Sequence, residues 1–225
     1  MAFSNVSGTV VALDDRVGRF VEAARELGRE TGSAAFTVPQ LVARAGLSLK
    51  SFYACFDGKD DLLVALLAAD SEVGAELLAE RLAVHRGRKA RLQAYVEDLF
   101  ALLGEPGAIG YATVLSREHR RLEIVRPQEL GDALAPLVQL LADEIAGPGP
   151  LDTSERRDVR ATAELVFALI LEGIHRVTVG REAAHEVATR LWTLCWDGLS
   201  ARPSSRRTTR KPTTRNRTTT RGNGR

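Results

Sequence analysis

Apolar residues recur at helical spacing along almost the whole chain, and alternating segments typical of strands are missing. The pattern therefore predicts an all-α protein. A first helix is expected to begin after Asp14 and Asp15, because acidic residues stabilise the positive end of a helix, and to end near Gly32. Its apolar face consists of Val17, Phe20, Val21, Ala24 and Leu27.

Two short helices are predicted next, joined by a sharp turn. Thr37 can cap the first of them in a capping box with Gln40, and Gly46 can end it, because glycine accepts a positive φ at little steric cost. Ser48 can then cap a second short helix, Leu49–Phe56. A glycine between two short helices lets the second helix stand out from the domain.

Longer helices follow. One is expected to begin at Asp60 and Asp61 and to extend to about Arg81, long enough to connect an N-terminal module to the rest. Glycine and proline signals separate the later helices, which are expected over residues 88–103, 109–120, 127–145, 154–179 and 182–199. Pro136 predicts a kink or a break, since a proline inside a helix costs about 3 kcal/mol.

Charge is unevenly distributed. The chain has 225 residues, 44% of them hydrophobic, and a formal net charge of +2. Residues 202–225 hold nine Lys or Arg and no acid, which leaves 22 basic and 29 acidic residues before them. A nucleic-acid surface on the folded part must therefore be a local patch. The tail, residues 201–225, is predicted to be disordered, and it either solubilises the protein or grips phosphate.

Cysteine usage and hydropathy point to the cytoplasm. Cys55 and Cys195 form no C-x-x-C pair, which argues against a disulfide scaffold and a zinc site. The longest strongly apolar run, Leu165–Leu171, is too short to cross a bilayer. Residues 2–13 lack the basic start of a secretory signal and are interpreted as a loose arm.

Residues 37–62, TVPQLVARAGLSLKSFYACFDGKDDL, resemble the DNA-binding segment of the TetR family of transcriptional regulators. The upstream stretch Arg19–Gly28 resembles that family's first helix. The matching positions are Thr37, Val38, Leu41, Ala45, Gly46, Leu47, Ser48, Phe52, Tyr53, Phe56, Lys59 and Leu62. The alternative to a DNA-binding segment is a helical hairpin that only forms part of a hydrophobic core.

The resemblance implies a helix-turn-helix module followed by a larger helical domain for effector binding and dimerisation. The expected division is a flexible arm over 1–14, the DNA-binding domain over 15–60, the larger domain over 61–200 and the basic tail over 201–225. The expected function is a cytoplasmic, nucleoid-associated, ligand-responsive regulator that binds a palindromic operator on double-stranded DNA as a homodimer. A small effector, expected to be hydrophobic, would release it. Repression is the favoured mode, and activation stays open as the alternative.

Chemistry assigns roles within the helix-turn-helix. Thr37, Tyr53 and Lys59, as a helix N-terminus, a hydroxyl donor and a mobile cation, suit contacts to phosphate. Leu49, Lys50 and Ser51 suit base reading, by packing on a thymine methyl and by hydrogen bonding to base edges. Ser48 is expected at the same interface. Two positions depart from the family: Lys50 replaces a common glycine, and Cys55 replaces a polar residue that is often histidine.

The last two predicted helices carry more apolar surface than one core needs, which indicates burial against a second copy. The residues expected at the dimer interface are Val166, Ile170, Ile174, Leu191, Leu194 and Trp192. The alternative is a monomeric core, because periodicity does not distinguish the two kinds of burial. The middle helices would enclose the effector, with candidate lining residues Phe100, Leu103, Tyr111, Leu115, Leu137 and Phe167, which could equally be core.

Two competing functions have some support in the sequence. Glu172 with His175 and Glu182 with His185 have the Glu-x-x-His spacing of di-iron bundles. Such a site also needs two more inward carboxylates on separate helices, whereas Glu182 and His185 lie at a predicted helix start just after Gly180. Hydrolase and phosphate-binding motifs are missing, so neither a catalytic residue, a metal nor a cofactor is expected. The other alternative is a helical adaptor that binds another protein and shows no preference for DNA.

Overall fold

The computed structural model describes residues 4–105 and 107–200. In this part of the chain all regular elements are helices, which confirms the all-α prediction. The α-helices are α1 (Ser4–Thr31), α2 (Val38–Ala45), α3 (Leu49–Cys55), α4 (Lys59–Leu82), α5 (Arg88–Ala101), α6 (Ala108–Val125), α7 (Pro127–Ala146), α8 (Thr153–Thr178) and α9 (Ala184–Ser200). A 3-10 turn, η1 (Leu102–Gly104), follows α5.

Two boundaries, the start of α1 and the end of α6, differ clearly from expectation. Helix α1 begins at Ser4, so the predicted start after Asp14 is wrong, and residues 4–14 are helical. No proline interrupts that stretch, so an acidic pair is not a sufficient start signal. Helix α6 continues past Arg120 to Val125 and stops before Pro127, because a proline disfavours helical geometry in the residue that precedes it. The predicted tail, 201–225, and residues 1–3 lie outside the described residues.

Two further details concern α7 and α9. Helix α7 runs through Pro136 as one element, so the proline does not split it. Helix α9 begins at Ala184 rather than at Glu182, because the chain adopts a left-handed conformation at Arg181 (φ 59°) just before it.

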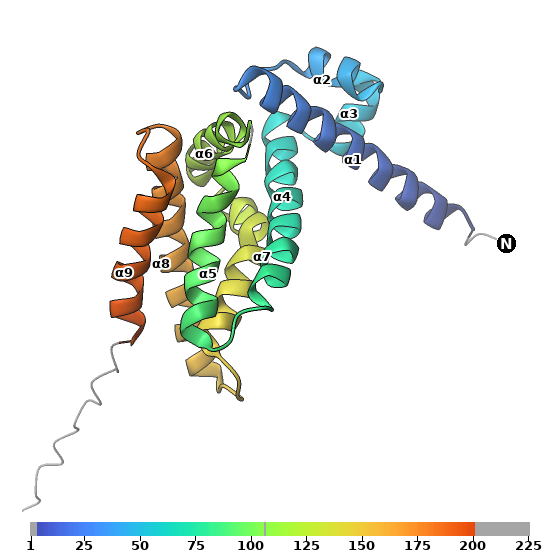
Figure 1. The fold of residues 1–225 in the computed structure, drawn as a ribbon. Coiled ribbons are helices and arrows are strands. Elements are labelled where there is room, and N and C mark those ends of the chain that lie inside the picture. Colours follow the sequence, from blue (N-terminus) through green and yellow to red (C-terminus); the bar gives the residue numbers. More distant parts are fainter. Residues whose placement is uncertain (1–3, 106, 201–225) are drawn as a thin grey trace, which may run out of the picture.

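Helix α4 joins two hydrophobic clusters. Its first half, with Leu62 and Leu66, packs with α1, α2 and α3 and with parts of α6 and α7. Its second half, with Leu78 and Leu82, packs with α5, α7, α8 and α9. Figure 1 shows α2 and α3 beside α1 at one end of α4, while the rest of α4 stands at the edge of a bundle that also contains α5 to α9.

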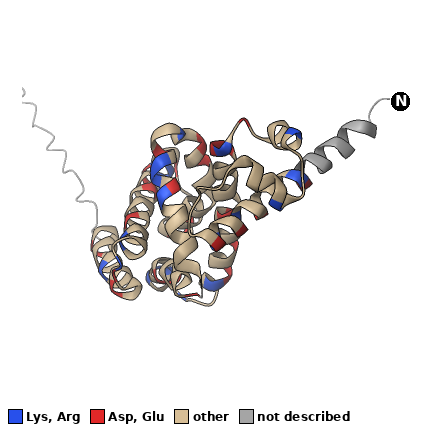
Figure 2. Ribbon diagram, turned by 90° about the horizontal axis from the view of Figure 1, so that it is seen from above, with Lys and Arg blue, Asp and Glu red and all other residues tan. Residues whose placement is uncertain are grey.

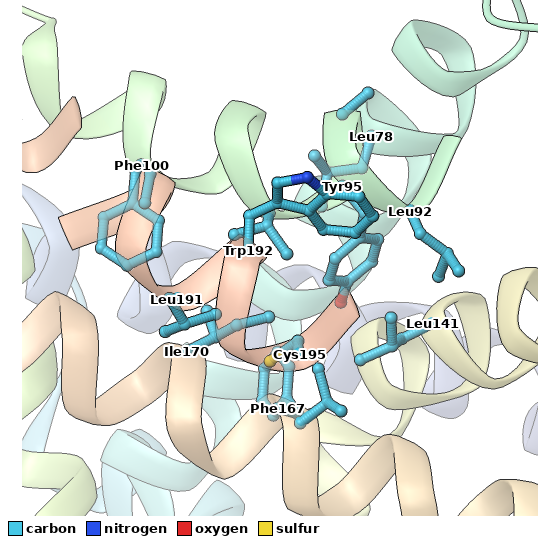
Figure 3. Packing of buried hydrophobic residues seen from close by; sticks show 14 of the residues in the cluster. Leu78, Leu92, Tyr95, Phe100, Leu141, Phe167, Ile170, Leu191, Trp192 and Cys195 are labelled. Atoms are coloured by element: carbon cyan, nitrogen blue, oxygen red, sulfur yellow. The ribbon is translucent and has the colours of Figure 1, made fainter. Parts of the chain in front are cut away.

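The larger cluster is built around aromatic residues. Tyr95, fully buried, donates a hydrogen bond through its hydroxyl to the Leu137 carbonyl, 2.8 Å away. Phe100, Phe167 and Trp192 belong to the same cluster (Figure 3). Burying such a side chain stabilises the fold by about 1.5–3 kcal/mol relative to leaving it exposed.

Gly173 marks the tightest packing in this cluster, between α8, α5 and α9. A Cβ at this position would lie 2.7 Å from Phe100 Cζ and 3.2 Å from both Leu191 Cδ1 and Val187 Cγ1. Gly173→Ala is therefore expected to lower the free energy of unfolding by about 1–3 kcal/mol, measured by urea denaturation.

Gly18→Ala is the matched control, because Gly18 also lies within a helix but has nothing within 4 Å of the place that an added methyl group would occupy. It is expected to stabilise the protein by up to about 1 kcal/mol through helix propensity. Equal effects of the two substitutions would show that Gly173 is not a packing constraint.

Within residues 4–105 and 107–200, no single helix has both the length and the apolarity of a membrane span. Helix α5 with η1 has the length and apolarity of a span only when it is combined with α6, and the two are bent by 116° relative to each other.

Candidate nucleic-acid interface

The turn between α2 and α3 is formed as the sequence predicts. Thr37 Oγ1 accepts from the Gln40 backbone N–H at 3.3 Å, and the Thr37 N–H donates to Gln40 Oε1 at 2.7 Å. Gly46 takes a left-handed conformation (φ 63°), which ends α2. Ser48 then caps α3 by accepting from the Ser51 N–H at 3.1 Å. The predicted caps and glycine turn are confirmed.

Arg19 of α1 adds a contact that sequence reasoning missed. Its guanidinium donates to the carbonyl of Ala45 at 2.6 Å and to that of Gly46 at 3.3 Å. Carbonyls at a helix C-terminus have no partner within the helix, so a cation there is stabilising. Arg19 therefore fixes the end of α2 and with it the direction of the turn.

Aromatic packing holds α3 against α1. Phe52 is fully buried, and its ring meets that of Phe20 edge-on, with centroids 5.6 Å apart. Phe56 meets the same Phe20 ring at 6.0 Å. The inner face of this short helix is therefore fixed by three rings, which leaves its other face turned away from the protein.

The outer face of α3 carries the residues predicted to meet DNA. The side chain of Leu49 is 47% exposed and that of Tyr53 59% exposed, and Lys50 is also exposed. Ser51 is half-buried, and its hydroxyl lies 2.9 Å from that of Ser48 in a shared hydrogen bond. Thr37 and Ser48 are exposed at the N-terminal ends of α2 and α3. The structure thus gathers six of the seven predicted residues around two helix N-termini and one exposed face.

Lys59, the seventh, is held by the protein rather than mobile as expected. Its ammonium group donates to the carbonyls of Ala34 and, at 3.0 Å, Phe36, and lies 4.5 Å from the centre of the Phe36 ring. Burial lowers the pKa of Lys59. Two of its three N–H groups therefore fix the segment before α2, and one is left for an external partner.

Acidic neighbours reduce the positive charge of this region. Arg44 of α2 pairs with Glu30 at 2.7 Å and with Glu26 at 3.3 Å, both on α1. The hydrogen bond from Arg44 lowers the pKa of Glu30. Basic and acidic segments are interspersed over the ribbon when it is viewed from above (Figure 2). Lys50 therefore stands out as an exposed cation on the outer face of α3.

A polar network connects α1 to the larger helical part. Asp70 of α4 accepts through Oδ1 from Arg25 of α1, at 3.0 and 2.7 Å, and through Oδ2 from the Tyr111 hydroxyl of α6, at 2.6 Å. Burial raises the pKa of Tyr111 far above its usual value, and the Asp70 charge adds to this. Burial lowers the pKa of Arg25, but the hydrogen bond to Asp70 and the charges of Asp70, Tyr111 and Glu22 together raise it above its usual value.

Removing both sides of this network tests its strength. Arg25→Gln and Asp70→Asn should each destabilise the protein, and their double-mutant cycle in urea denaturation should give a coupling energy of about 1–3 kcal/mol. The side chains of Arg25 and Asp70 are only 18% and 22% exposed, so water does not screen the pair fully. Strictly additive effects would mean that α1 is not held through this pair.

Helix α6 is also tied to the beginning of α4. Arg121 donates to Asp60 at 2.6 and 3.1 Å, and Arg126, which follows α6, pairs with Asp61 at 2.9 Å. Helix α6 is therefore linked to α4 near both of its own ends, through Tyr111 and through Arg121.

A cavity of about 760 Å³ lies among α4, α5, α6, α7 and α8. Of the predicted ligand-binding residues, Leu103, Leu115, Leu137 and Phe167 line it. Phe100 lines a smaller cavity of about 390 Å³ beside α9. Tyr111 is absent from the lining and instead bonds to Asp70, which does line the larger cavity.

The polar lining of this cavity has no counterpart among the sequence predictions. It includes Asp70, Ser71, His119 and Arg120. Burial lowers the pKa of His119. No sequence motif marks these positions, because they come together from α4 and α6 only in the folded chain.

Four of the residues predicted at a dimer interface are buried within a single chain. Val166, Ile170, Leu191 and Trp192 are at most 9% exposed within a single chain and belong to its own core. Ile174 is half-buried against the same core. The apolar stripe of α8 serves its own domain, since periodicity identifies a stripe but not what covers it.

Other leucines of α8 and α9 are exposed instead. Leu165 and Leu169 on α8 are 71% and 43% exposed, and Leu194 on α9, the one predicted interface residue left on the surface, is 64% exposed. Helices α8 and α9 pack against each other.

The Glu-x-x-His pairs have other partners. Glu172 pairs with Arg120, and His175 Nδ1 lies 3.1 Å from Ser116 Oγ. Glu182 pairs with Arg176 and Arg190. Among the described residues, no group of three or more His, Cys, Asp or Glu side chains could hold a metal ion.

Comparison with known proteins gives one family. Residues 20–66 match the family described as bacterial regulatory proteins, tetR family. The matched segment contains α2, α3 and the start of α4. No curated protein matches the sequence.

Solved structures resemble the whole described fold. A TetR transcriptional regulator from Rhodococcus sp. RHA1 is 17% identical, with a TM-score of 0.68 over 82% of this chain and 95% of that one. The regulator FadR from Bacillus subtilis, in complex with stearoyl-CoA, is 20% identical, with a TM-score of 0.61 over 80% and 97%. The reduced form of NemR from E. coli is 16% identical, with a TM-score of 0.57 over 81% and 97%. At these identities the likeness concerns the fold.

Proposed function

We propose that this chain, whose residues 20–66 match the TetR family of bacterial regulatory proteins and whose fold is that of such regulators, represses transcription as an operator-binding homodimer. The observation that carries the proposal is α3, whose buried face is fixed by Phe52 while Leu49, Lys50 and Tyr53 are presented outward. The major groove of B-DNA, about 12 Å wide, admits one such helix.

Each exposed residue has a role in the proposed complex. Lys50 donates to guanine O6 or N7, Leu49 packs on a thymine methyl, and Ser51 pairs with a base edge. Thr37, Ser48, Tyr53 and Lys59 contact phosphates, the first two through the N-terminal ends of α2 and α3. These contacts to phosphate set the position of α3 in the groove.

Changes at Lys50 and Tyr53 separate the two kinds of contact. Lys50→Ala is expected to change the preferred base at one position of each half-site, with about 1–3 kcal/mol of discrimination lost. Tyr53→Phe is expected to weaken binding to all duplexes alike, by about 1 kcal/mol, because it removes a hydrogen bond to phosphate.

Fluorescence anisotropy with a panel of duplexes that differ at single positions measures both effects. Glu76→Gln, an exposed change on α4 away from α3, is the control and should leave every affinity unchanged. If Lys50→Ala left the base preference unaltered, Lys50 would not contact the bases as proposed. A helical adaptor would show no preference for any duplex in the first place.

We place the two-fold axis of the dimer at the exposed leucines of α8 and α9. Leu165, Leu169 and Leu194 are apolar side chains on two packed helices. Pairing of these helices with those of a second copy would form a four-helix bundle, and would set the distance between the two α3 helices. A palindromic operator follows from this symmetry.

The cavity among α4 to α8 is proposed as the effector site. Its lining is largely apolar, which suits a hydrophobic effector, and stearoyl-CoA, in the FadR complex, has a long acyl chain. Asp70 lines the cavity and holds Arg25 of α1, so a ligand that shifts α4 or α6 would change the orientation of the DNA-binding helices. Binding of the effector would thereby release the operator.

The remaining assignments follow from this function. The DNA-binding domain comprises residues 15–60, and the effector and dimerisation domain comprises 61–200, with α4 continuous between them. The family and the similar structures are regulators, and the chain is proposed to have no catalytic activity. Because its partner is the operator, we place it with the nucleoid in the cytoplasm.

A further inference from the structure

The proposed effector cavity has an apolar interior. Leucines from several helices line it, among them Leu67 of α4, Leu99 of α5 and Leu137 of α7. Phe167 of α8 adds an aromatic ring. An occupant of this part of the cavity must therefore present a large apolar body.

The hydroxyl group of Ser71 is buried and has no hydrogen-bond partner among the described residues. Ser71 lies on α4 in the cavity lining and is 2% exposed. A helical serine commonly donates to the carbonyl four residues before it, but Ser71 does not. Because a buried unpaired hydroxyl is unfavourable, this group calls for an acceptor on a ligand.

The charges in the lining are mostly negative. Five carboxylates and two guanidiniums line the cavity: Asp70, Glu123, Asp132, Glu164, Glu172, Arg120 and Arg160. Both arginines already have acidic partners, since Arg120 pairs with Glu172 and Arg160 pairs with Glu164.

Two carboxylates of the lining form no ion pair among the described residues, although the nearby imidazole of His119 interacts electrostatically with Glu123. Asp70 is bound by Arg25, whereas neither Glu123 nor Asp132 has an ion pair within the described part of the chain. Both are exposed, Glu123 near the end of α6 and Asp132 in the first half of α7. They therefore lie in the solvent-exposed part of the lining of a largely apolar cavity.

We propose that this cavity binds an organic cation: a large apolar body among the leucines, a hydrogen-bond acceptor at Ser71 and a positive group at Glu123 and Asp132. This rests on the proposed function, in which the same cavity holds the effector. An organic anion is disfavoured, because it would meet two unpaired carboxylates and could reach Arg120 or Arg160 only by breaking an existing ion pair.

Two fluorescent probes of matched shape test the sign of the charge. Rhodamine 6G is a cation, and fluorescein ethyl ester at pH 8 is an anion; both have a three-ring body and an ester acceptor. Fluorescence anisotropy in low salt is expected to show rhodamine 6G bound at least about 10-fold more tightly, because attraction and repulsion at partly screened charges add.

Variants locate the interaction. The double change Glu123→Gln with Asp132→Asn should weaken rhodamine 6G by about 3- to 10-fold and should not weaken the anion. Ser71→Ala should weaken the cation by about 2- to 10-fold through the lost hydrogen bond. Glu76→Gln, an exposed carboxylate outside the lining, is the matched control and should change neither affinity. Unchanged melting temperatures verify that the variants fold.

Equal or tighter binding of the anion, binding of neither probe, or an effect of the double change no larger than that of Glu76→Gln would each overturn the proposal. Operator binding by the ligand-free protein is measured separately. Intact operator binding with failed probe selectivity refutes only the cationic ligand, whereas lost operator binding refutes the proposed function.

Discussion

Replacing both Leu165 and Leu169 by glutamate is expected to convert the protein to a monomer and to weaken binding to a two-half-site duplex by at least about 100-fold. These side chains are 71% and 43% exposed on α8, and in the proposed dimer they are buried against a second copy. Four glutamates at one two-fold interface would combine desolvation with repulsion. A monomer then holds one half-site and gains nothing from the other.

Sedimentation velocity measures the assembly, and anisotropy with the full duplex and with a single half-site measures the affinity. Val84→Glu is the control, because Val84 is 80% exposed but lies just after α4 and not on α8 or α9. It should leave both measurements unchanged. If the double variant remained dimeric, the dimer interface would have to lie on another surface of the protein.

Phe52→Ala is expected to lower the free energy of unfolding by about 3–5 kcal/mol and to abolish operator binding. Phe52 is fully buried, and its ring contacts Phe20 edge-on at 5.6 Å and Phe56 at 5.4 Å. Without this ring α3 loses the contact that fixes its inner face. Urea denaturation gives the stability, and anisotropy gives the affinity for the operator.

Tyr53→Ala separates packing from recognition on the same helix. Tyr53 is 59% exposed, so its removal should cost less than about 1 kcal/mol of stability while still weakening DNA binding. If Phe52→Ala and Tyr53→Ala destabilised the protein equally, Phe52 would not be the anchor of α3.

Local structure around α2 and α3 can be predicted because its signals are short-range. Thr37 and Ser48 form their caps with residues three positions away, and Gly46 adopts the positive φ that its lack of a Cβ permits. Arg19 and Lys59 cannot be placed in the same way. Their partners, the carbonyls of Ala45 and Phe36, are distant in sequence. No sequence pattern indicates which carbonyl a basic side chain will contact.

The larger domain shows the limit of periodicity. Ile170 of α8 and Leu191 of α9 lie on apolar stripes, and the sequence does not say whether a stripe faces its own core or a second chain. Phe100, predicted to line the effector site, packs instead near Gly173. Asp70 and Ser71 line the cavity, but no motif in the sequence of α4 distinguishes them. The roles of these residues depend on which helices pack together, and this is determined by the tertiary structure.

The central claim is that α3, presented twice by a symmetric dimer, reads DNA sequence. Selection of duplexes from a random pool by the purified protein tests it most directly. A palindrome should be enriched, with its half-sites centred about one helical turn, or a whole number of turns, apart. Recovery of duplexes with no shared sequence in low salt would contradict the account.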